Sequence, residues 1–294
     1  GVAALDFVGY ADQIFSASII DRFDIVAWDP RGVGQSDPRI DCVDSMDDYF
    51  GLDPSPDDAT ETEQLISGAQ EFAAACMTLS SEFLPYVSTI DAASDIDVLR
   101  RSLDEEHISF MGFSYGTSLG ATWATLFPET VRAAVLDAAV DPTRGYVDDL
   151  ILQAGGFEDS LNAFFAKCDA SPCLFMKVGE SAEEAFDRIL LSLDQNPIAN
   201  DDGRAVTNQG VAQTGIAGTL YGDYQWPQLE NALSAADIGD GQPLLILFDE
   251  YFGRNSAGQI DNSIDAYFGI SCLDRDQNLT NDQVFDLTDE LTSV

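Results

Sequence analysis

The sequence has 294 residues, 45% of them apolar, which is enough for one substantial core and for one catalytic domain carrying a large insertion. Its 52 acidic and 13 basic residues give a formal net charge of −39. Phosphate binding needs basic patches that such a surface lacks, so the composition excludes nucleic acid as a partner. The acid excess fits two interpretations: a solvated, salt-adapted surface, or acidic groups that attract a cationic substrate such as a peptide amino terminus.

Apolar runs are short throughout the chain. The longest, Leu244–Phe248, is far below the roughly 18 apolar residues of a transmembrane helix, so no membrane span is predicted. The segment Gly1–Leu5 does not have the basic and apolar stretches of an export signal, and the first residue is not Met. The sequence therefore reads as starting within a protein.

The cysteines predict disulfides rather than a metal centre. Cys168 and Cys173 flank a short Ser-Pro segment that suits a local bridge, and Cys42 and Cys76 could form a second one. Zinc would need more ligands nearby, and the chain has a single histidine, so we expect no metal. Cys272 is then left over, either as a buried free thiol or with a partner outside this chain. Disulfides favour an oxidising compartment, and we expect a secreted or cell-envelope protein.

The first half of the chain alternates strand and helix patterns. Phe23–Trp28 is predicted to be a buried strand, followed by a loop at 29–36 that its prolines and glycines require. Helices are expected at about 61–77 and, from an N-cap at Ser88, over 88–100.

A second alternation follows directly. A strand is predicted over His107–Phe113, a helix over Tyr115–Phe127 that Pro128 stops, and a strand over Val131–Leu136. This order predicts an α/β fold with a mostly parallel, doubly wound sheet. From 141 to 269 the apolar spacing is helical, which predicts a helical cap inserted into the core. The helical spacing is set by Phe157, Leu161, Phe164, Phe165, Leu229, Leu233, Leu244 and Leu247.

The motif Gly-Phe-Ser-Tyr-Gly lies between this strand and helix. Such a motif forms a nucleophile elbow, in which a strained turn presents the serine above the carboxyl edge of a sheet. Ser114 is therefore the predicted nucleophile, and the backbone N–H of Tyr115 is predicted to face the developing oxyanion. Glycine is expected at positions 112 and 116 because side chains there would collide with neighbouring backbone. The flanking order makes an α/β-hydrolase the predicted fold.

The serine needs a base and a carboxylate that orients it. The single histidine, His107, lies seven residues before Ser114 on the same strand, which is roughly 23 Å at the usual rise per residue. It is therefore predicted to be a surface residue at the strand start and not the base. In this fold the acid and then the histidine follow the nucleophile in the chain. Asp137, after the next strand, is an alternative position for the acid.

Several segments together resemble the secreted actinobacterial tripeptidyl aminopeptidases and the related proline-iminopeptidase-like hydrolases. The resemblance covers nearly the whole chain. It rests on the segments Asp29–Ser36, Asp91–Arg100, Gly112–Thr117, Val135–Pro142, Tyr221–Leu233 and Ile270–Asp274.

The resemblance implies a domain division and also two departures. It implies a hydrolase core at 1–140, a helical cap at 141–269 and a return to the core at 270–294. Family members carry a glycine-rich loop that supplies the second oxyanion N–H, and Gly1-Val2 resembles its last step. They also carry an Asp and a His further along than Val294. We therefore expect an internal fragment that is inactive alone and lacks the triad His and Asp, with the partner of Cys272 further downstream.

Weaker patterns have ordinary explanations. Gly32–Gly34 follows the expected strand as a dinucleotide loop would, but Asp37 stands at the third glycine position and Pro38 opposes a helix. Asp274–Asn278 lacks the glycine and closing Glu of a calcium loop, and a surface turn is predicted there. Asp29 and Arg31 are predicted to support the loop beside the active site through a charge-assisted pair.

The sequence thus predicts a serine hydrolase that uses no cofactor. The first hypothesis is an exported aminopeptidase that releases short peptides or single residues through an acyl-enzyme on Ser114, with a peptide or small ester as substrate. The second is an esterase or other non-peptide hydrolase, because fold alone does not select the leaving group. The third is a non-catalytic binding protein on the same fold.

Overall fold

The computed structural model describes residues 4–56, 58–141, 143–200, 204, 206–275, 279–281, 283–284 and 287. Its backbone contacts divide the chain into two compact units. The first combines Gly1–Cys42, Ala75–Gly145 and Asp261–Asn278, and the second combines Val43–Ala74, Tyr146–Ile260 and Leu279–Val294. The expected domains at 1–140, 141–269 and 270–294 stay predictions.

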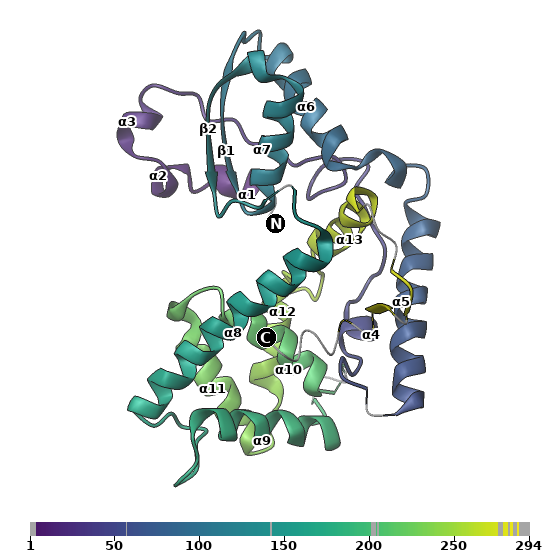
Figure 1. Ribbon diagram of the computed structural model, residues 1–294, viewed down its shortest axis with the longest axis vertical. Helices are drawn as coiled ribbons and strands as arrows, with labels where there is room; N and C mark the ends of the chain where they lie inside the picture. Colours follow the sequence, from purple (N-terminus) through teal and green to yellow (C-terminus); the bar gives the residue numbers. More distant parts are fainter. Residues whose placement is uncertain are drawn as a thin grey trace. The chain divides into compact units, whose positions relative to one another are not determined.

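The first unit contains a small parallel sheet with helices packed against it (Figure 1). Its elements are α1 (Ala4–Val8), α2 (Ala11–Ile14), α3 (Ala17–Ile20), the end of α5 (Ala59–Leu79), η1 (Leu84–Tyr86), α6 (Thr89–Ser102), β1 (Ile108–Phe113), α7 (Tyr115–Leu126), η2 (Pro128–Thr130), β2 (Val131–Asp137) and α13 (Ser263–Asp274).

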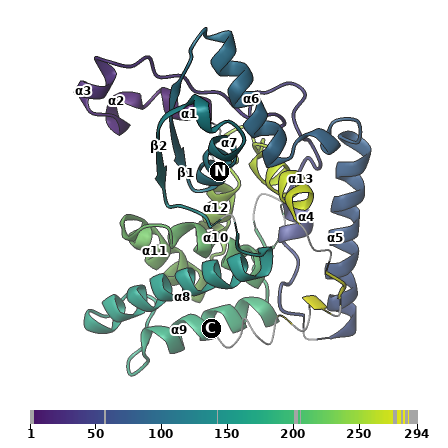
Figure 2. The ribbon, with the colours of Figure 1, turned by 45° about the horizontal axis from the view of Figure 1, so that its top comes forward.

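The strands β1 and β2 pair in parallel, with Phe113 opposite Asp137. The connecting helix α7 lies against both strands and against α6 (Figure 2). It can approach closely because Gly120 has no side chain, and a Cβ there would collide with the ring of Phe110. Buried residues from α6, β1 and α7 form the core of this unit, and Trp123 of α7 and Ile96 of α6 are almost completely inaccessible to solvent. The predicted strand, helix and parallel strand are confirmed.

The predicted strand at Phe23–Trp28 is wrong. The segment is without regular secondary structure and only partly buried, with Val26 53% exposed. Trp28 packs edge-on against Phe110, at 6.5 Å between ring centroids, but the segment forms no ladder with β1 or β2. A strand exists only where a neighbouring backbone pairs with it, whereas the apolar pattern reports side-chain preference alone. Among the described residues, the sheet expected to be doubly wound is therefore a two-stranded parallel sheet in a mostly helical structure.

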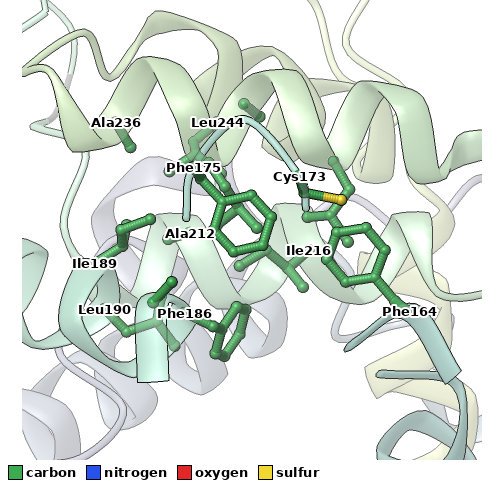
Figure 3. Packing of buried hydrophobic residues seen from close by; sticks show 14 of the residues in the cluster. Phe164, Cys173, Phe175, Phe186, Ile189, Leu190, Ala212, Ile216, Ala236 and Leu244 are labelled. Atoms are coloured by element: carbon green, nitrogen blue, oxygen red, sulfur yellow. The ribbon is translucent and has the colours of Figure 1, made fainter. Parts of the chain in front are cut away.

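The second unit is helical, as the apolar spacing beyond residue 141 predicts. Its core packs α8, α9, α10, α11 and α12 around aromatic and aliphatic side chains such as Phe164, Phe175 and Leu244 (Figure 3). No helix in the described ranges is both long and apolar enough to cross a bilayer. The elements are α4 (Asp47–Phe50), most of α5, α8 (Tyr146–Ala170), α9 (Ala182–Gln195), α10 (Gln209–Thr219), η3 (Asp223–Gln225), α11 (Trp226–Asp237) and α12 (Gln242–Tyr251).

Capping residues explain where the predicted helices begin and end. The Ser88 side chain accepts a hydrogen bond from the N–H of Asp91 and starts α6, as predicted. Ser181 starts α9 through a reciprocal capping box with Glu184. Helix α7 ends at Leu126, just before Pro128, because proline cannot continue the backbone hydrogen bonds of a helix. The expected helix at 61–77 is confirmed within α5.

Both predicted disulfides are present. Cys168 pairs with Cys173 in the core of the second unit, and Cys42 pairs with Cys76 in the first. Cys272 is free and its side chain is exposed, so the alternative of a buried thiol is wrong.

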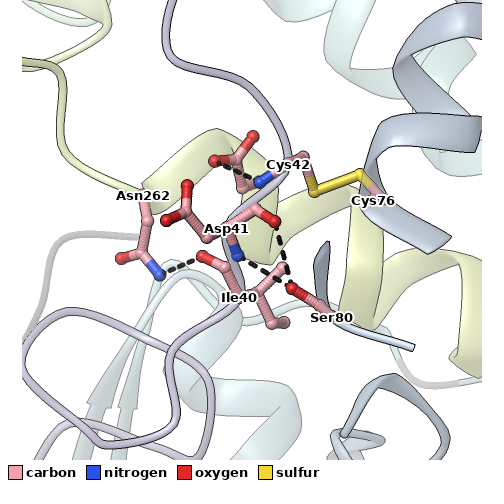
Figure 4. Close-up of a disulfide and its surroundings, with 7 residues drawn as sticks. Ile40, Asp41, Cys42, Cys76, Ser80 and Asn262 are labelled. Atoms are coloured by element: carbon pink, nitrogen blue, oxygen red, sulfur yellow. Dashed lines mark hydrogen bonds between the residues drawn. A yellow bond between two sulfur atoms is a disulfide. The ribbon is translucent and has the colours of Figure 1, made fainter. Parts of the chain in front are cut away.

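A buried polar cluster surrounds Cys42 (Figure 4). Asn262 donates to the carbonyl oxygens of Gly32 and Ile40, at 2.8 Å each, and the Ser80 hydroxyl donates to the carbonyl of Asp41. The Cys42 N–H donates to one carboxylate oxygen of Asp265, whose other oxygen is buried without a hydrogen bond. Burial therefore raises the pKa of Asp265 to about 7.

The raised pKa of Asp265 makes the stability of the protein depend on pH. The folded state keeps this proton above the ordinary aspartate pKa of about 3.9, whereas the unfolded state releases it. The Asp265 contribution to the unfolding free energy should therefore fall as pH rises from about 4 to about 7 and then level off. Chemical denaturation at several pH values should show wild type losing stability relative to Asp265→Asn across that range. The exposed-site variant Asp159→Asn is the control, and parallel curves for wild type and Asp265→Asn would contradict the assignment.

Candidate active site

Ser114 occupies a strained turn between β1 and α7. Its backbone has φ 51° and ψ −120°, a left-handed conformation that costs a non-glycine residue about 1–3 kcal/mol. The Ser114 N–H donates to the carbonyl of Asp137 at 3.0 Å, which extends the β1 and β2 pairing by one step. Ser114 is exposed at the carboxyl end of β1. This conformation is the one that a nucleophile elbow requires.

Thr117 fixes the elbow from inside α7. This residue is only 1% exposed, and its hydroxyl donates to the Ser114 carbonyl at 2.6 Å. The same hydroxyl oxygen accepts the N–H of Val140 at 2.9 Å. One side chain therefore joins the strained residue to the segment that follows β2. The sequence pattern predicts no role for Thr117, although this residue directly follows the elbow motif.

The two elbow glycines have different steric surroundings. A Cβ at Gly112 would lie against the carbonyl group of Gly116, closer than real Cβ atoms come to other atoms. At Gly116 a Cβ would meet nothing within 4 Å. The predicted collision therefore holds at Gly112 and is wrong at Gly116.

This difference predicts unequal effects of two alanine substitutions. Gly112→Ala should destabilise the protein by about 1–3 kcal/mol or more, since backbone atoms must shift to make room. Gly116→Ala should be neutral or stabilise by up to about 1 kcal/mol, because alanine favours helix over glycine. Denaturant unfolding of both variants tests this, and equal losses would refute the steric account of Gly112.

Tyr115 directs its side chain toward the start of α6. Its hydroxyl lies 2.7 Å from the Thr89 hydroxyl, which in turn donates to Asp274 at 2.6 Å. Burial raises the Tyr115 pKa to about 12, so the phenol keeps its proton at neutral pH. The elbow motif predicts a role for the Tyr115 backbone alone and none for Thr89 or Asp274.

The segment α1 lies against the elbow. The ring of Phe7 stacks on that of Phe113, the residue before Ser114, at 5.8 Å between centroids. The Leu5 N–H donates to the buried Asp29 carboxylate at 3.1 Å. The position where Gly1-Val2 were expected to end an oxyanion loop lies outside the described residues.

Asp29 and Arg31 hold the loop at 29–36 but do not pair with each other. The Asp29 carboxylate accepts the N–H of Gln35 as well as that of Leu5. Arg31 makes a bidentate pair with Asp95 of α6, at 2.7 and 2.5 Å, and donates to the Tyr86 carbonyl. These bonds fix the loop against the helix whose first residue contacts Tyr115.

In the part of the chain that the structure describes, no interaction with the Ser114 side chain is shown for the other residues considered from the sequence. His107 is exposed immediately before β1, as expected, and Asp137 is exposed at the end of β2.

A cavity of about 300 Å³ is lined by Arg31, Asp95 and Trp28 but not by Ser114. Asp274 ends α13, and the rest of the turn expected there, 276–278, lies outside the described residues. The described ranges hold no group of three or more His, Cys, Asp or Glu residues placed to bind a metal.

Comparison with known proteins matches the chain to one family. A model of the family described as alpha/beta hydrolase fold matches residues 9–269. The chain is 32% identical over 284 residues to the serine protease Hip1 of Mycobacterium tuberculosis, covering 93% of this chain and 55% of Hip1. It is 33% identical over 286 residues to carboxylesterase B of the same species, covering 93% and 54%.

A third relative matches a shorter part of the chain. The tripeptidyl aminopeptidase of Streptomyces lividans is 41% identical over 130 residues, which is 44% of this chain and 24% of that protein. The chain therefore spans about half the length, or less, of the curated relatives it matches.

Proposed function

Because the chain belongs to the α/β-hydrolase family, we propose that Ser114 is the nucleophile of a serine hydrolase. The observation that carries the proposal is the backbone of Ser114, held at positive φ between a parallel strand and a helix. Such strain persists only where the surrounding structure imposes it, and Thr117 and Asp137 do so here.

In this proposal the Ser114 hydroxyl attacks the carbonyl carbon of the substrate while a base takes its proton. The Tyr115 N–H stabilises the negative charge that develops on the carbonyl oxygen. The bond to the leaving amine or alcohol then breaks, the leaving group takes the proton, and water releases the acyl group from Ser114.

The base is proposed to be a histidine outside this sequence. His107 is the single histidine of the chain, and it precedes β1 whereas Ser114 follows it. The six residues of β1 span about 20 Å at the rise of an extended strand. We propose likewise that an aspartate outside this sequence orients the base, with Asp137 as the alternative.

We propose an aminopeptidase as the specific activity. The similarity to a tripeptidyl aminopeptidase and to a serine protease supports a peptide substrate. The acid excess of the chain supports a cationic amino terminus as the recognised group. The predicted helical cap at 141–269 is proposed to limit substrate length, on a hydrolase core with a larger parallel sheet. The two disulfides support an exported protein.

The nucleophile assignment can be tested by covalent labelling of the full-length natural protein. A fluorophosphonate probe should label the peptide that contains Ser114, and Ser114→Ala should abolish labelling and lower kcat by at least about a thousandfold. Ser118→Ala, one turn further along α7, is the matched control and should label normally. No labelling of the wild type would favour a non-catalytic binding protein.

The esterase alternative rests on the similarity to carboxylesterase B. Matched peptides with free and acetylated amino termini should separate the two activities. An aminopeptidase should lose at least tenfold in kcat/KM on acetylation, about 1.4 kcal/mol of transition-state binding. Mass spectrometry should show short peptides or single residues released from the free terminus. Equal rates on both peptides, together with faster cleavage of acyl esters, would support the esterase instead.

A further inference from the structure

We propose that Thr89 and Asp274 are positioning residues for the oxyanion-binding N–H of Tyr115. This inference rests on the proposed function of Ser114. It concerns three elements of the first unit, the starts of α6 and α7 and the end of α13, which meet through one chain of side-chain hydrogen bonds.

The direction of this chain follows from counting protons. A carboxylate only accepts hydrogen bonds, so the single hydroxyl proton of Thr89 is used toward Asp274, at 2.6 Å. The Thr89 oxygen can then only accept from Tyr115, at 2.7 Å. The phenol is available as the donor because burial raises its pKa to about 12. Tyr115 is therefore anchored at the end of its side chain by a bond that ends on a carboxylate.

The position of Asp274 is unfavourable for its own helix. It is the last residue of α13, where the negative end of the helix dipole disfavours a carboxylate. Its carboxylate contacts the start of α6, where it accepts a hydrogen bond at 2.9 Å from the N–H of Thr89, which has no partner within the helix. Asp274 therefore acts on α6 and, through the Thr89 hydroxyl, on Tyr115.

The consequence concerns the oxyanion. A donor contributes to catalysis only when it is already aimed at the position that the negative charge will occupy. The Tyr115 backbone is fixed on one side by the strained Ser114 and on the other by its anchored phenol. Loss of the anchor should leave the nucleophile in place but allow the Tyr115 N–H to deviate from that aim.

The test compares Thr89→Val, which removes the hydroxyl, with Thr89→Ser, which keeps it, and with Tyr115→Phe in the full-length natural protein. Thr125→Val on α7 is the control, because it removes a hydrogen bond within the helix only. We expect Thr89→Val and Tyr115→Phe to lower kcat and the rate of Ser114 phosphonylation roughly tenfold, the size of one lost hydrogen bond, with KM nearly unchanged. Thr89→Ser should recover most of the rate.

A double variant separates positioning from stability. Because Asp274 acts through Thr89, the single variant Asp274→Asn should lower kcat and the phosphonylation rate relative to the wild type. Adding Asp274→Asn to Thr89→Val should lower these rates little further. If the cluster merely caps α6, the variants should change the melting temperature while the phosphonylation rate stays at the wild-type value, and the proposal is then overturned. A large rise in KM with unchanged kcat would instead make Asp274 a substrate-binding group.

Hydrogen exchange of the Tyr115 amide gives a readout that does not need activity. Thr89→Val should speed this exchange severalfold, and Thr125→Val should not. If fluorophosphonate does not label the wild type but Thr89→Val still exchanges the Tyr115 amide faster than the wild type does, the anchor is retained and the serine hydrolase is rejected. Labelled protein with unchanged exchange and unchanged rate in Thr89→Val would reject the anchor and retain the hydrolase.

Discussion

The left-handed backbone of Ser114 is the constraint on which the first unit depends. A single non-glycine residue in this conformation is unfavourable, so neighbouring groups must hold it there. Asp137 accepts its N–H, Thr117 donates to its carbonyl, and the missing side chain of Gly112 lets the start of α7 approach the strand. Each of these contacts joins a different part of the strand, helix and strand unit, so the elbow is a property of the whole unit and not of the five-residue motif.

Helix α13 extends the same support to the loop and disulfide. Asn262, just before its first turn, accepts the N–H of Gly34 and donates to the carbonyls of Gly32 and Ile40. Asp265 accepts the N–H of the disulfide-bonded Cys42, and Asp274 accepts two bonds from Thr89. Polar side chains along one helix therefore hold segments that precede it by more than 180 positions. Because the bonds of Asn262 and Asp265 are buried or partly buried, each is costly to leave unmade once its partner is removed.

The sequence predicts local structure where the signal is local. The elbow motif, the Ser88 cap and Pro128 each act within a few residues, and the strand, helices and stop that they predict are present. The strand expected at Phe23–Trp28 fails because a strand needs a paired neighbour, which side-chain pattern does not report. Asp274 was predicted to lie in a surface turn for a related reason: its partners Thr89 and Tyr115 are identified only once α13 and α6 are placed together.

Charge links this support to the proposed chemistry. With 52 acidic residues, carboxylates lie close to the elbow, at Asp274 and Asp137, although an oxyanion disfavours nearby negative charge. The chain offsets this at Asp274, where the N–H and hydroxyl of Thr89 both donate to the carboxylate at the positive end of α6. The negative charge of Asp95 is likewise offset, by its bidentate pair with Arg31. In the proposed function, negative charge can then surround Ser114 and favour a cationic substrate terminus, while the Tyr115 N–H proposed to bind the oxyanion remains fixed.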